Sequence, residues 1–321
     1  MSKATIYHDF HTGRITGGGV LDRIGMELMR TAAFILAPIE FFGFSWAAAL
    51  VRSIFRGQNQ VQVKLSQDTI FEYPYGDGYW SMLLYNKMAY SPEIHGYLKS
   101  FTDIDYAFID CGSNFGYMSV LVSSDAFGNK PAIAIEADPE NYQKTVHNAN
   151  LNGKRFDHCH NAVFDESGKK VPLFGAKHEA FSLRSEEGDH ARAEVETLAL
   201  DDLSGWLERQ GNPKSILKLD VEGVEIDALK GAGKILKNDC LVIYEEHGSD
   251  IDHEISRYLK SHLNMRLYFG GSDGKKMTEI TSFDEISKLK TSKRYGYDLF
   301  ATASDFWVDR LNRLMQDQRS D

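Results

Sequence analysis

The chain has 321 residues, of which 42% are hydrophobic and 26% are charged, so it is globular rather than disordered or fibrous. Its formal net charge of −10 argues against a nucleic-acid partner. Three widely spaced cysteines without a C-x-x-C pair favour a reducing, cytoplasmic setting over a disulfide framework or a zinc site.

Residues 1–60 predict an N-terminal helical appendage. The stretch 31–51, TAAFILAPIEFFGFSWAAALV, reaches the length of a membrane span but has Pro38, Glu40 and Gly43 in its middle, so two helices broken near Pro38 are expected instead. The appendage has six Lys or Arg and four Asp or Glu, which leaves −12 for the rest of the chain. We expect residues 20–56 to pack on the chain's own core, on a second subunit, or on the inner face of a membrane.

Residues 61–104 predict a small β and helical lead-in. The tract VQVKLSQDTIFEYPYG alternates apolar and polar residues in two runs, as in a β-hairpin. Ser91 followed by Pro92 predicts the start of a helix over 91–101. The aromatic side chains of Tyr75, Tyr79 and Trp80 are suited to stacking on a sugar ring, although aromatic residues near a hairpin more often belong to its core.

Residues 105–302 repeat the order strand, turn, helix. Short apolar strands of this kind are typical of a sheet covered by helices on both faces, so we predict a doubly wound α/β domain. Two further strands near 170–174 and 193–198 indicate an insertion, and residues 303–321 predict a docking helix with Phe306, Leu311 and Leu314 on one face. The strands are expected at 106–111, 131–136, 157–163, 214–220, 239–246, 265–269 and 295–302, and the helices at 115–125, 139–151, 200–210, 224–232 and 251–263.

The turn after the first of these strands, D-C-G-S-N-F-G, predicts a ligand site. Ligands of open α/β sheets bind at the carboxyl ends of strands, and Gly112 and Gly116 let a backbone turn and approach a ligand closely. Asp110 within the turn, with no cation before Lys130, argues against a phosphate group. The ligand is therefore not expected to be a polyanion.

Carboxylates also end the second and fourth strands. Glu136 is placed to accept hydrogen bonds from both hydroxyls of a ribose, as in sites for NAD or for S-adenosylmethionine. Asp138 is expected to cap the helix that begins at Pro139. Asp220, in K-L-D-V-E-G-V-E, makes a third acidic strand end. An acidic rim suits a sulfonium cation and repels a pyrophosphate.

These motifs together resemble the FkbM family of S-adenosylmethionine-dependent methyltransferases. The stretches D-C-G-S-N-F-G, E-A-D-P-E-N-Y, N-A-N-L-N-G, L-A-L-D-D-L, K-L-D-V-E-G-V-E and A-L-K-G-A occur in the family's order over about residues 70–302, with Cys111 and Ser113 in place of the more usual Val and Ala. The resemblance implies a Rossmann-like class I methyltransferase sheet of strand order 3-2-1-4-5-7-6 with an antiparallel seventh strand. It also implies S-adenosylmethionine as cofactor and methyl transfer to a hydroxyl of a sugar, glycan or natural product.

Carried over to this sequence, the family's motifs imply ten cofactor-binding residues. The methionine end of the cofactor would contact Asp110, Gly112, Asn114 and Gly116. Glu136 would hold the ribose, and the adenine would lie beside Asn161 and Ala162. The ten are Asp110, Gly112, Ser113, Asn114, Gly116, Glu136, Ala137, Asn161, Ala162 and Asp220.

A catalytic base is expected at the end of the fifth strand, Y-E-E-H-G-S-D, beside Asp220. We predict His247 as the base, with Asp220 or Glu246 as the alternative and alignment without a base as a third possibility. A metal held by Asp220, Glu246 and His247 is conceivable, but no compact ligand motif is present and none is expected.

Two rival functions stay open at this point. A Rossmann-type, NAD-dependent oxidoreductase would share the glycine turn and Glu136 but would not explain Asp110 or the D-V-E-G stretch. A non-catalytic, membrane-attached binding module would rely on residues 20–56. Cofactor binding distinguishes all three functions.

Overall fold

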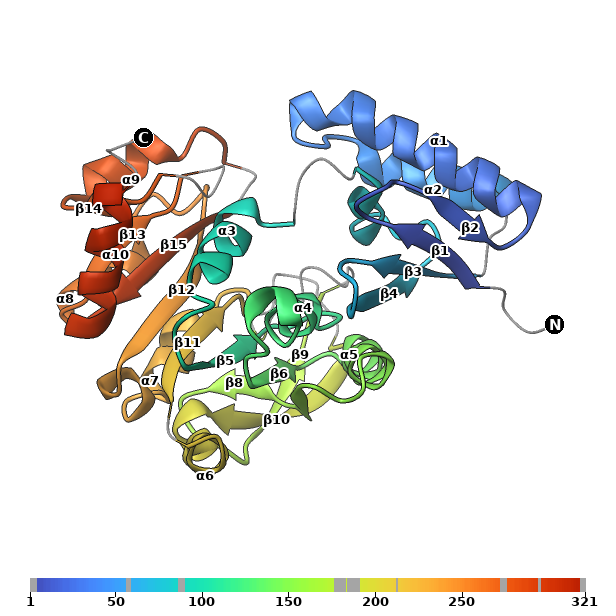
Figure 1. Ribbon diagram of the computed structural model, residues 1–321. Coiled ribbons are helices and arrows are strands. Elements are labelled where there is room, and N and C mark those ends of the chain that lie inside the picture. Colours follow the sequence, from blue (N-terminus) through green and yellow to red (C-terminus); the bar gives the residue numbers. More distant parts are fainter. Residues whose placement is uncertain are drawn as a thin grey trace.

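The computed structural model describes residues 5–55, 59–85, 90–175, 183, 191–211, 213–271, 276–293 and 296–317. Its centre is an eight-stranded sheet of order β14-β13-β15-β12-β11-β5-β6-β7 (Figure 1). Strands β7, β6, β5, β11 and β12 pair in parallel, and β15 lies antiparallel between β12 and β13. The bounds are β5 Tyr106–Cys111, β6 Ala132–Glu136, β7 Asp157–His160, β11 Lys214–Leu219, β12 Cys240–His247, β13 Arg266–Phe269, β14 Thr278–Ile280 and β15 Gly296–Thr302.

Helices cover both faces of this sheet, which confirms the doubly wound α/β fold. Phe108, Ile216 and Ile243 belong to a buried cluster with α3 (Pro92–Ser100), α4 (Tyr117–Val122), α5 (Pro139–Leu151) and α10 (Asp305–Asp317). Their strand neighbours Ile109 and Leu217 belong to a second cluster with α6 (Ser204–Arg209), α7 (Glu225–Lys230), α8 (Glu254–Ser261) and α9 (Phe283–Leu289). Successive residues of a strand point to opposite faces, so apolar runs are needed to fill both clusters.

The predicted third strand divides at Asn161. Its first part, β7, stays in the main sheet, whereas β8 (Ala162–Phe164) leaves it and pairs with β10 (Ala193–Ala199). Strand β10 also pairs with β9 (Lys170–Leu173), so the two predicted extra strands exist and form a separate sheet, β8-β10-β9. Strand β14 was not predicted, and the helix expected at 200–210 begins as a 3₁₀ turn, η4 (Leu200–Leu203). Two further 3₁₀ turns, η3 (Asp125–Phe127) and η5 (Ile235–Lys237), follow α4 and α7.

The N-terminal segment is not purely helical, which corrects the sequence expectation. Residues 5–17 form β1 (Thr5–Asp9) and β2 (Ile15–Gly17), and β1 pairs in parallel with β3 of the predicted hairpin. The resulting sheet, β2-β1-β3-β4, joins segments on both sides of residue 60. The remaining elements are α1 (Val20–Leu36), η1 (Ala37–Ile39), α2 (Phe44–Phe55), β3 (Gln60–Lys64), β4 (Ile70–Pro74) and η2 (Trp80–Leu84).

The predicted break near Pro38 is confirmed, because η1 separates α1 from α2. Within the ranges given above, no helix is both long enough and apolar enough to cross a membrane.

Two asparagines of the N-A-N-L-N-G motif attach the sheet β2-β1-β3-β4 to the domain built on the eight-stranded sheet. The side-chain amide of Asn148 accepts from Glu72 N (2.8 Å) and donates to Glu72 O (3.1 Å). Asn152, one helical turn later, makes the same pair of bonds to Ile70 at 3.0 and 2.7 Å. Asn148 lies on α5 and Asn152 caps the end of that helix, and both satisfy the backbone of the edge strand β4, which would otherwise offer unpaired polar groups.

The ends of two helices differ from expectation. Ser91 precedes α3 as predicted, but it has a left-handed backbone (φ 42°) and its side chain makes no capping bond. In α10 the residues that reach the core are Trp307 and Leu311, both 0% exposed, whereas Phe306 is 37% exposed. The helix therefore docks as expected, but through a face rotated toward Trp307.

Candidate active site

A cleft opens at the carboxyl ends of β5, β6 and β11, between the turns that follow these strands and a wall of aromatic side chains. Because parallel strands end on the same rim, turns far apart in sequence meet there. The residues of the cleft that matter below are Tyr79, Trp80, Tyr90, Asp110, Gly112, Ser113, Asn114, Tyr117, Glu136, Ala137, Asn161, Ala162, Lys218, Asp220 and Glu222.

Nine of the ten predicted cofactor residues line this cleft; Gly116 does not. Gly116 precedes α4 with a left-handed backbone (φ 80°), and a Cβ placed on it would lie 3.2 Å from Thr145 and 3.4 Å from Phe156. Its absent side chain lets α4 approach α5. The glycine therefore serves helix packing at this point and not ligand approach.

Gly112 is required by the chain itself. It has φ 72°, and a Cβ there would lie 1.7 Å from the carbonyl oxygen of Asp220. The turn is held by the amides of Gly112 and Ser113, which both donate to Ile135 O, at 3.0 and 3.1 Å. The turns after β5 and β11 can therefore come this close only with glycine at position 112.

Asp110 places a buried carboxylate in the cleft wall. Its Oδ2 accepts from Ser119 N (3.2 Å) and Ser119 Oγ (2.8 Å). Its Oδ1 accepts no hydrogen bond from any residue that the structure describes, and Lys218 Nζ lies 3.9 Å away. Burial raises the pKa of Asp110, and the ammonium of Lys218 opposes that shift. An unsatisfied buried acceptor is costly, so this oxygen is suited to a ligand donor.

Glu136, at the end of the neighbouring strand β6, also lines the cleft. Its Oε2 accepts from Asn114 N (2.7 Å) and its Oε1 from Asp138 N (2.8 Å), and the side chain is buried. Burial raises the pKa of Glu136 to about 8, although these amides favour the charged form. The predicted cap is confirmed as well, since Asp138 Oδ1 accepts from Glu140 N and Asn141 N, both at 2.9 Å.

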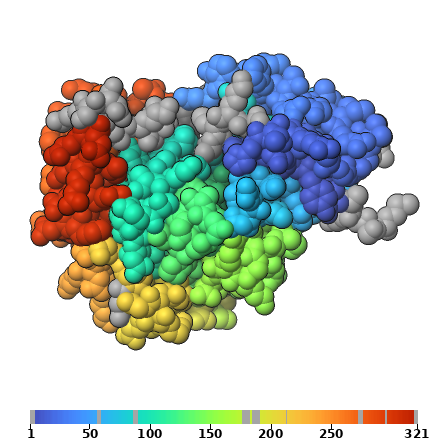
Figure 2. All heavy atoms as spheres, viewed as in Figure 1, coloured from blue at the N-terminus to red at the C-terminus, as the bar shows by residue number. Residues whose placement is uncertain are grey.

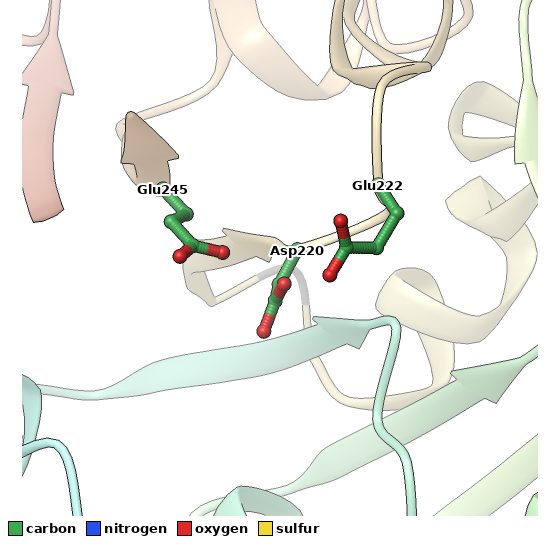
Figure 3. A group of neighbouring side chains, drawn as sticks. All are labelled: Asp220, Glu222 and Glu245. Carbon is green, nitrogen blue, oxygen red and sulfur yellow. The ribbon is translucent and has the colours of Figure 1, made fainter. Parts of the chain in front are cut away.

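A row of charged side chains crosses the same face of the sheet beyond Asp110. Register places Lys218 beside Asp110, and Glu245 opposite Asp298 on the antiparallel strand β15. Asp220, two residues after Lys218, points the same way because side chains alternate. Oxygens of Asp220, Glu222 and Glu245 lie within 4.8 Å of one another (Figure 3).

Lys218 is the cation of this row. Its Nζ contacts Asp220 Oδ2 at 2.9 Å. Burial lowers the pKa of Lys218, but Asp220 and Asp110 outweigh it and hold that pKa above its ordinary value.

Two carboxyl groups in the row have raised pKa values. Burial and the charges of Asp220 and Glu222 raise the pKa of Glu245 well above its usual range. Burial and Glu93 do the same for the pKa of Asp298, and the carboxyl groups of Glu93 and Asp298 are hydrogen-bonded to one another. Two carboxyl groups can share a hydrogen bond only when one of them is protonated.

The acidic group of three differs from the metal set considered from sequence. Asp220, Glu222 and Glu245 could ligate a cation, but Lys218 already pairs with Asp220, and exposed acidic groups of this kind are common without an ion. We assign no metal to it.

Three predicted site residues lie outside the cleft. Glu246, the neighbour of Glu245, points to the opposite face, where it is 0% exposed and contacts His253, Ser256 and Lys290. His247 is exposed, with Nδ1 2.6 Å from Ser249 Oγ. Tyr75 is buried inside the N-terminal segment, and its hydroxyl faces Asp22 O at 3.4 Å. The first two are corrected as base candidates and the third as a substrate contact.

The other predicted aromatic residues do form a wall of the cleft. Trp80 Nε1 donates to Asn114 Oδ1 at 3.0 Å, and its ring stacks on Tyr117 with centroids 5.3 Å apart. The hydroxyls of Tyr79 and Tyr90 are hydrogen-bonded to each other. Burial raises the pKa of both tyrosines, and the charge of Asp220 adds to both shifts, so these hydroxyls lie near the acidic row.

Sequence reasoning missed Lys218, Asp298 and Tyr90 and, at the end of the fifth strand, chose Glu246 over its neighbour Glu245. Lys218 stood in a motif already singled out, whereas the choice between the two glutamates needed the register of β12 against β11. Asp298 needed the register of an antiparallel strand, and Tyr90 comes from a loop with no strand end nearby.

Comparisons with known proteins bear on this site. A profile described as "Methyltransferase FkbM domain" matches residues 110–297, more than half of the chain. No curated protein matches. Among solved structures, a methyltransferase FkbM from Methylobacillus flagellatus is 16% identical, with a TM-score of 0.40, over 61% of this chain and 43% of its own. This chain thus spans less than half of that protein's length.

Two other solved structures have lower identity. A precorrin-6y C5,15-methyltransferase from Geobacter metallireducens is 13% identical over 68% of this chain and 91% of its own, with a TM-score of 0.37. P. horikoshii TYW2, in complex with MeSAdo, is 12% identical over 84% and 85%, with a TM-score of 0.39. Scores this low add nothing to the family match.

Proposed function

Because the chain belongs to the FkbM methyltransferase family, we propose that it moves the methyl group of S-adenosylmethionine, the cofactor of this methyltransferase, to a hydroxyl oxygen of a sugar, glycan or natural-product acceptor. Membership in this family favours methyl transfer over the hydride transfer of an oxidoreductase. The proposal that the acceptor atom is a hydroxyl oxygen rests on the residues in and beside the cleft.

The residues of the cleft fit the cofactor. The free oxygen of Asp110 and the Ser113 hydroxyl, which is also buried and unpaired among the described residues, are suited to the donors of an amino acid end. The carboxylate of Glu136 accepts from the amides of Asn114 and Asp138 and lines the cleft, where it is placed to accept from a ribose hydroxyl. The bound cofactor supplies an activated methyl group on a positively charged sulfur, which an acidic rim favours.

The observation that carries the acceptor assignment is the row of carboxyl groups ending beside the aromatic wall. Glu245 and Asp298 continue the row beyond Asp220, and the Tyr79 and Tyr90 hydroxyls lie within electrostatic reach of it. Carboxyl and phenol groups together bind the many hydroxyls of a saccharide, while the ring faces pack on its C–H surface.

We assign the base to Glu245. Methyl transfer requires the acceptor oxygen to be aligned with the methyl group and its proton to be removed as the new bond forms. Glu245 has an oxygen near Asp220 and Glu222 and a raised pKa, so its ionised form is a stronger base than an ordinary carboxylate. Asp220 is held by Lys218 and serves to position the row. A positive charge nearby favours ionisation of Glu245, so cofactor binding prepares the base.

A Glu245→Gln variant tests this assignment. We expect unchanged affinity for S-adenosylhomocysteine, since the proposed cofactor contacts lie elsewhere, and a turnover lowered by about 10² to 10⁴. His247→Asn is the matched control, because His247 is on the same strand but exposed outside the cleft, and it should keep its turnover. Full turnover in the Glu245→Gln variant, or a large loss in His247→Asn, would contradict the assignment.

The acceptor itself can be found by mass spectrometry of glycans and metabolites from cells with and without a functional copy. The product should be heavier than its precursor by one CH₂ unit, and carbon NMR should place the new methyl group on oxygen. A methyl group on nitrogen or carbon would refute O-methylation while leaving methyl transfer intact.

A further inference from the structure

Helices α1 and α2 form a hairpin whose inner side is buried. Gly25, near the start of α1, would place a Cβ 3.1 Å from Val51 and 3.2 Å from Phe55 at the end of α2, so the two helices run antiparallel. Met29 of α1 and Ala48 of α2 are 0% exposed. The hairpin is therefore part of the folded protein.

The outer side of this hairpin is apolar as well. On α1, Ile24 and Leu28 lie one turn apart, and on α2 Trp46, Leu50 and Ile54 follow one another at four-residue spacing, so each set forms a stripe along one side of its helix. All five are between 44% and 83% exposed. Of the fourteen large hydrophobic side chains exposed in the described parts of the chain, eleven lie between residues 20 and 54.

The apolar surface continues around the connection between the helices. Phe34, Ile39 and Phe42 are each more than half exposed at this end of the hairpin. The hairpin forms an outer edge of the molecule, coloured blue (Figures 1 and 2). The surface is thus a protruding ridge, which a fluid lipid phase can surround without a matching groove.

The charges of the hairpin balance one another. Residues 20–55 carry three arginines and three carboxylates, so the hairpin has no net charge, whereas the whole chain has −10. The guanidinium groups of Arg23 and Arg52 are exposed and form no ion pair or hydrogen bond with any residue in the described ranges. Asp22 accepts from Gly19 N and Asn59 Nδ2, and Glu27 pairs with Arg30. The hairpin therefore lacks the negative charge that the rest of the chain carries.

We propose that the α1–α2 hairpin docks this methyltransferase on a lipid bilayer, with Trp46, Leu50 and Ile54 inserted at the boundary between headgroups and acyl chains. A helix with an apolar side and flanking arginines lies in the plane of such a surface. Tryptophan is favoured at this depth. A second copy on the same face would bring together two chains of net charge −10, whereas a bilayer can leave the acidic main domain in water.

Trp46 reports on this contact directly. It is 83% exposed, while the other three tryptophans of the chain, Trp80, Trp206 and Trp307, are at most 5% exposed. We expect its fluorescence to shift to shorter wavelength, and to be quenched by brominated acyl chains, when the full-length protein meets vesicles of phosphatidylcholine and phosphatidylserine. Vesicles of phosphatidylcholine alone should bind to a similar extent, because the three arginines of the hairpin are balanced by three carboxylates.

A Leu50→Glu variant keeps the reporter and should lower vesicle partitioning at least about tenfold. Ile251→Glu is the control, because Ile251 is 75% exposed outside the hairpin, and it should leave partitioning unchanged. Both variants should retain their melting temperature and their affinity for S-adenosylhomocysteine, since the substituted side chains are exposed.

Two outcomes overturn the proposal. One is a wild-type protein that neither sediments with the mixed vesicles nor changes its Trp46 emission. The other is a wild-type dimer, measured by light scattering, that Leu50→Glu dissociates while the brominated lipids leave the emission unquenched; the ridge would then bind a second copy.

Discussion

A Glu136→Gln variant is expected to bind S-adenosylhomocysteine about ten to a hundred times more weakly than the wild-type protein at pH 8 and above. The two oxygens of Glu136 are fixed by Asn114 N and Asp138 N and still have lone pairs facing the cleft. Hydrogen bonds to a charged group contribute about 1.5 to 3 kcal/mol, which gives that range of affinities. Glutamine keeps the shape of the side chain but loses the charge.

The difference should depend on pH, and its sign follows from the raised pKa. Burial gives Glu136 a pKa of about 8 in the free protein, so the carboxyl group is mostly protonated below that pH. If the ribose hydroxyls bind the ionised form, affinity rises as the pH rises toward 8. About 1% of the group is ionised at pH 6 and about half at pH 8, so wild-type affinity should strengthen roughly fiftyfold over that interval.

Titration calorimetry between pH 6 and pH 8, in buffers of different ionisation enthalpy, measures both quantities. Wild type should release close to one proton on binding at pH 6.5, and Glu136→Gln should lack that component. Burial raises the pKa of Asp110 in both proteins alike, so the ratio of their affinities isolates Glu136. Glu140→Gln, on an exposed side chain at the start of α5, is the control. A ratio that stays constant across this interval would refute the ribose contact.

Three further substitutions separate stability from catalysis. Glu246→Gln should lower the free energy of unfolding in urea by about 3 kcal/mol or more, because it breaks a buried charged network, while the turnover of the folded enzyme stays unchanged. Gly112→Ala should cost far more melting temperature than Gly153→Ala: both backbones are left-handed, but only the first added Cβ collides with a carbonyl, 1.7 Å away. Gly296→Ala would place a Cβ 1.2 Å from Glu245 Oε1, so it should displace that carboxylate and lower turnover with cofactor affinity retained.

The strand ends were predictable because each is a local pattern. Asp110, Glu136 and Asp220 all follow short apolar runs, and the structure places all three in one cleft. The cap at Asp138 also follows from a few adjacent residues. Information within about ten residues was sufficient for these features.

The predictions that failed concern residues whose positions depend on the pairing of strands that are far apart in the sequence. His247 and Glu246 were chosen by nearness to Asp220 along the rim, but burial of one and exposure of the other depend on which face each position takes. Strands β1 and β2 were missed because their own antiparallel pairing is short, and the second partner of β1 is β3, more than fifty residues later. The sequence does not distinguish Tyr75 from the aromatic residues beside it. Only its packing against the α1–α2 hairpin places it outside the cleft.

Glu245 and Glu246 are consecutive on β12 and lie on opposite faces of the sheet. This arrangement restricts the insertions and deletions that the strand can accept. Deleting or inserting one residue within β12 would exchange the side chains on the two faces of the strand. Glu245 would then enter the network around Lys290, and the row of charged side chains would lose the proposed base in the same event. Among homologues of this protein, insertions and deletions should therefore be absent from β12 and concentrate in connections such as that between β9 and β10. An alignment of homologues would test this expectation.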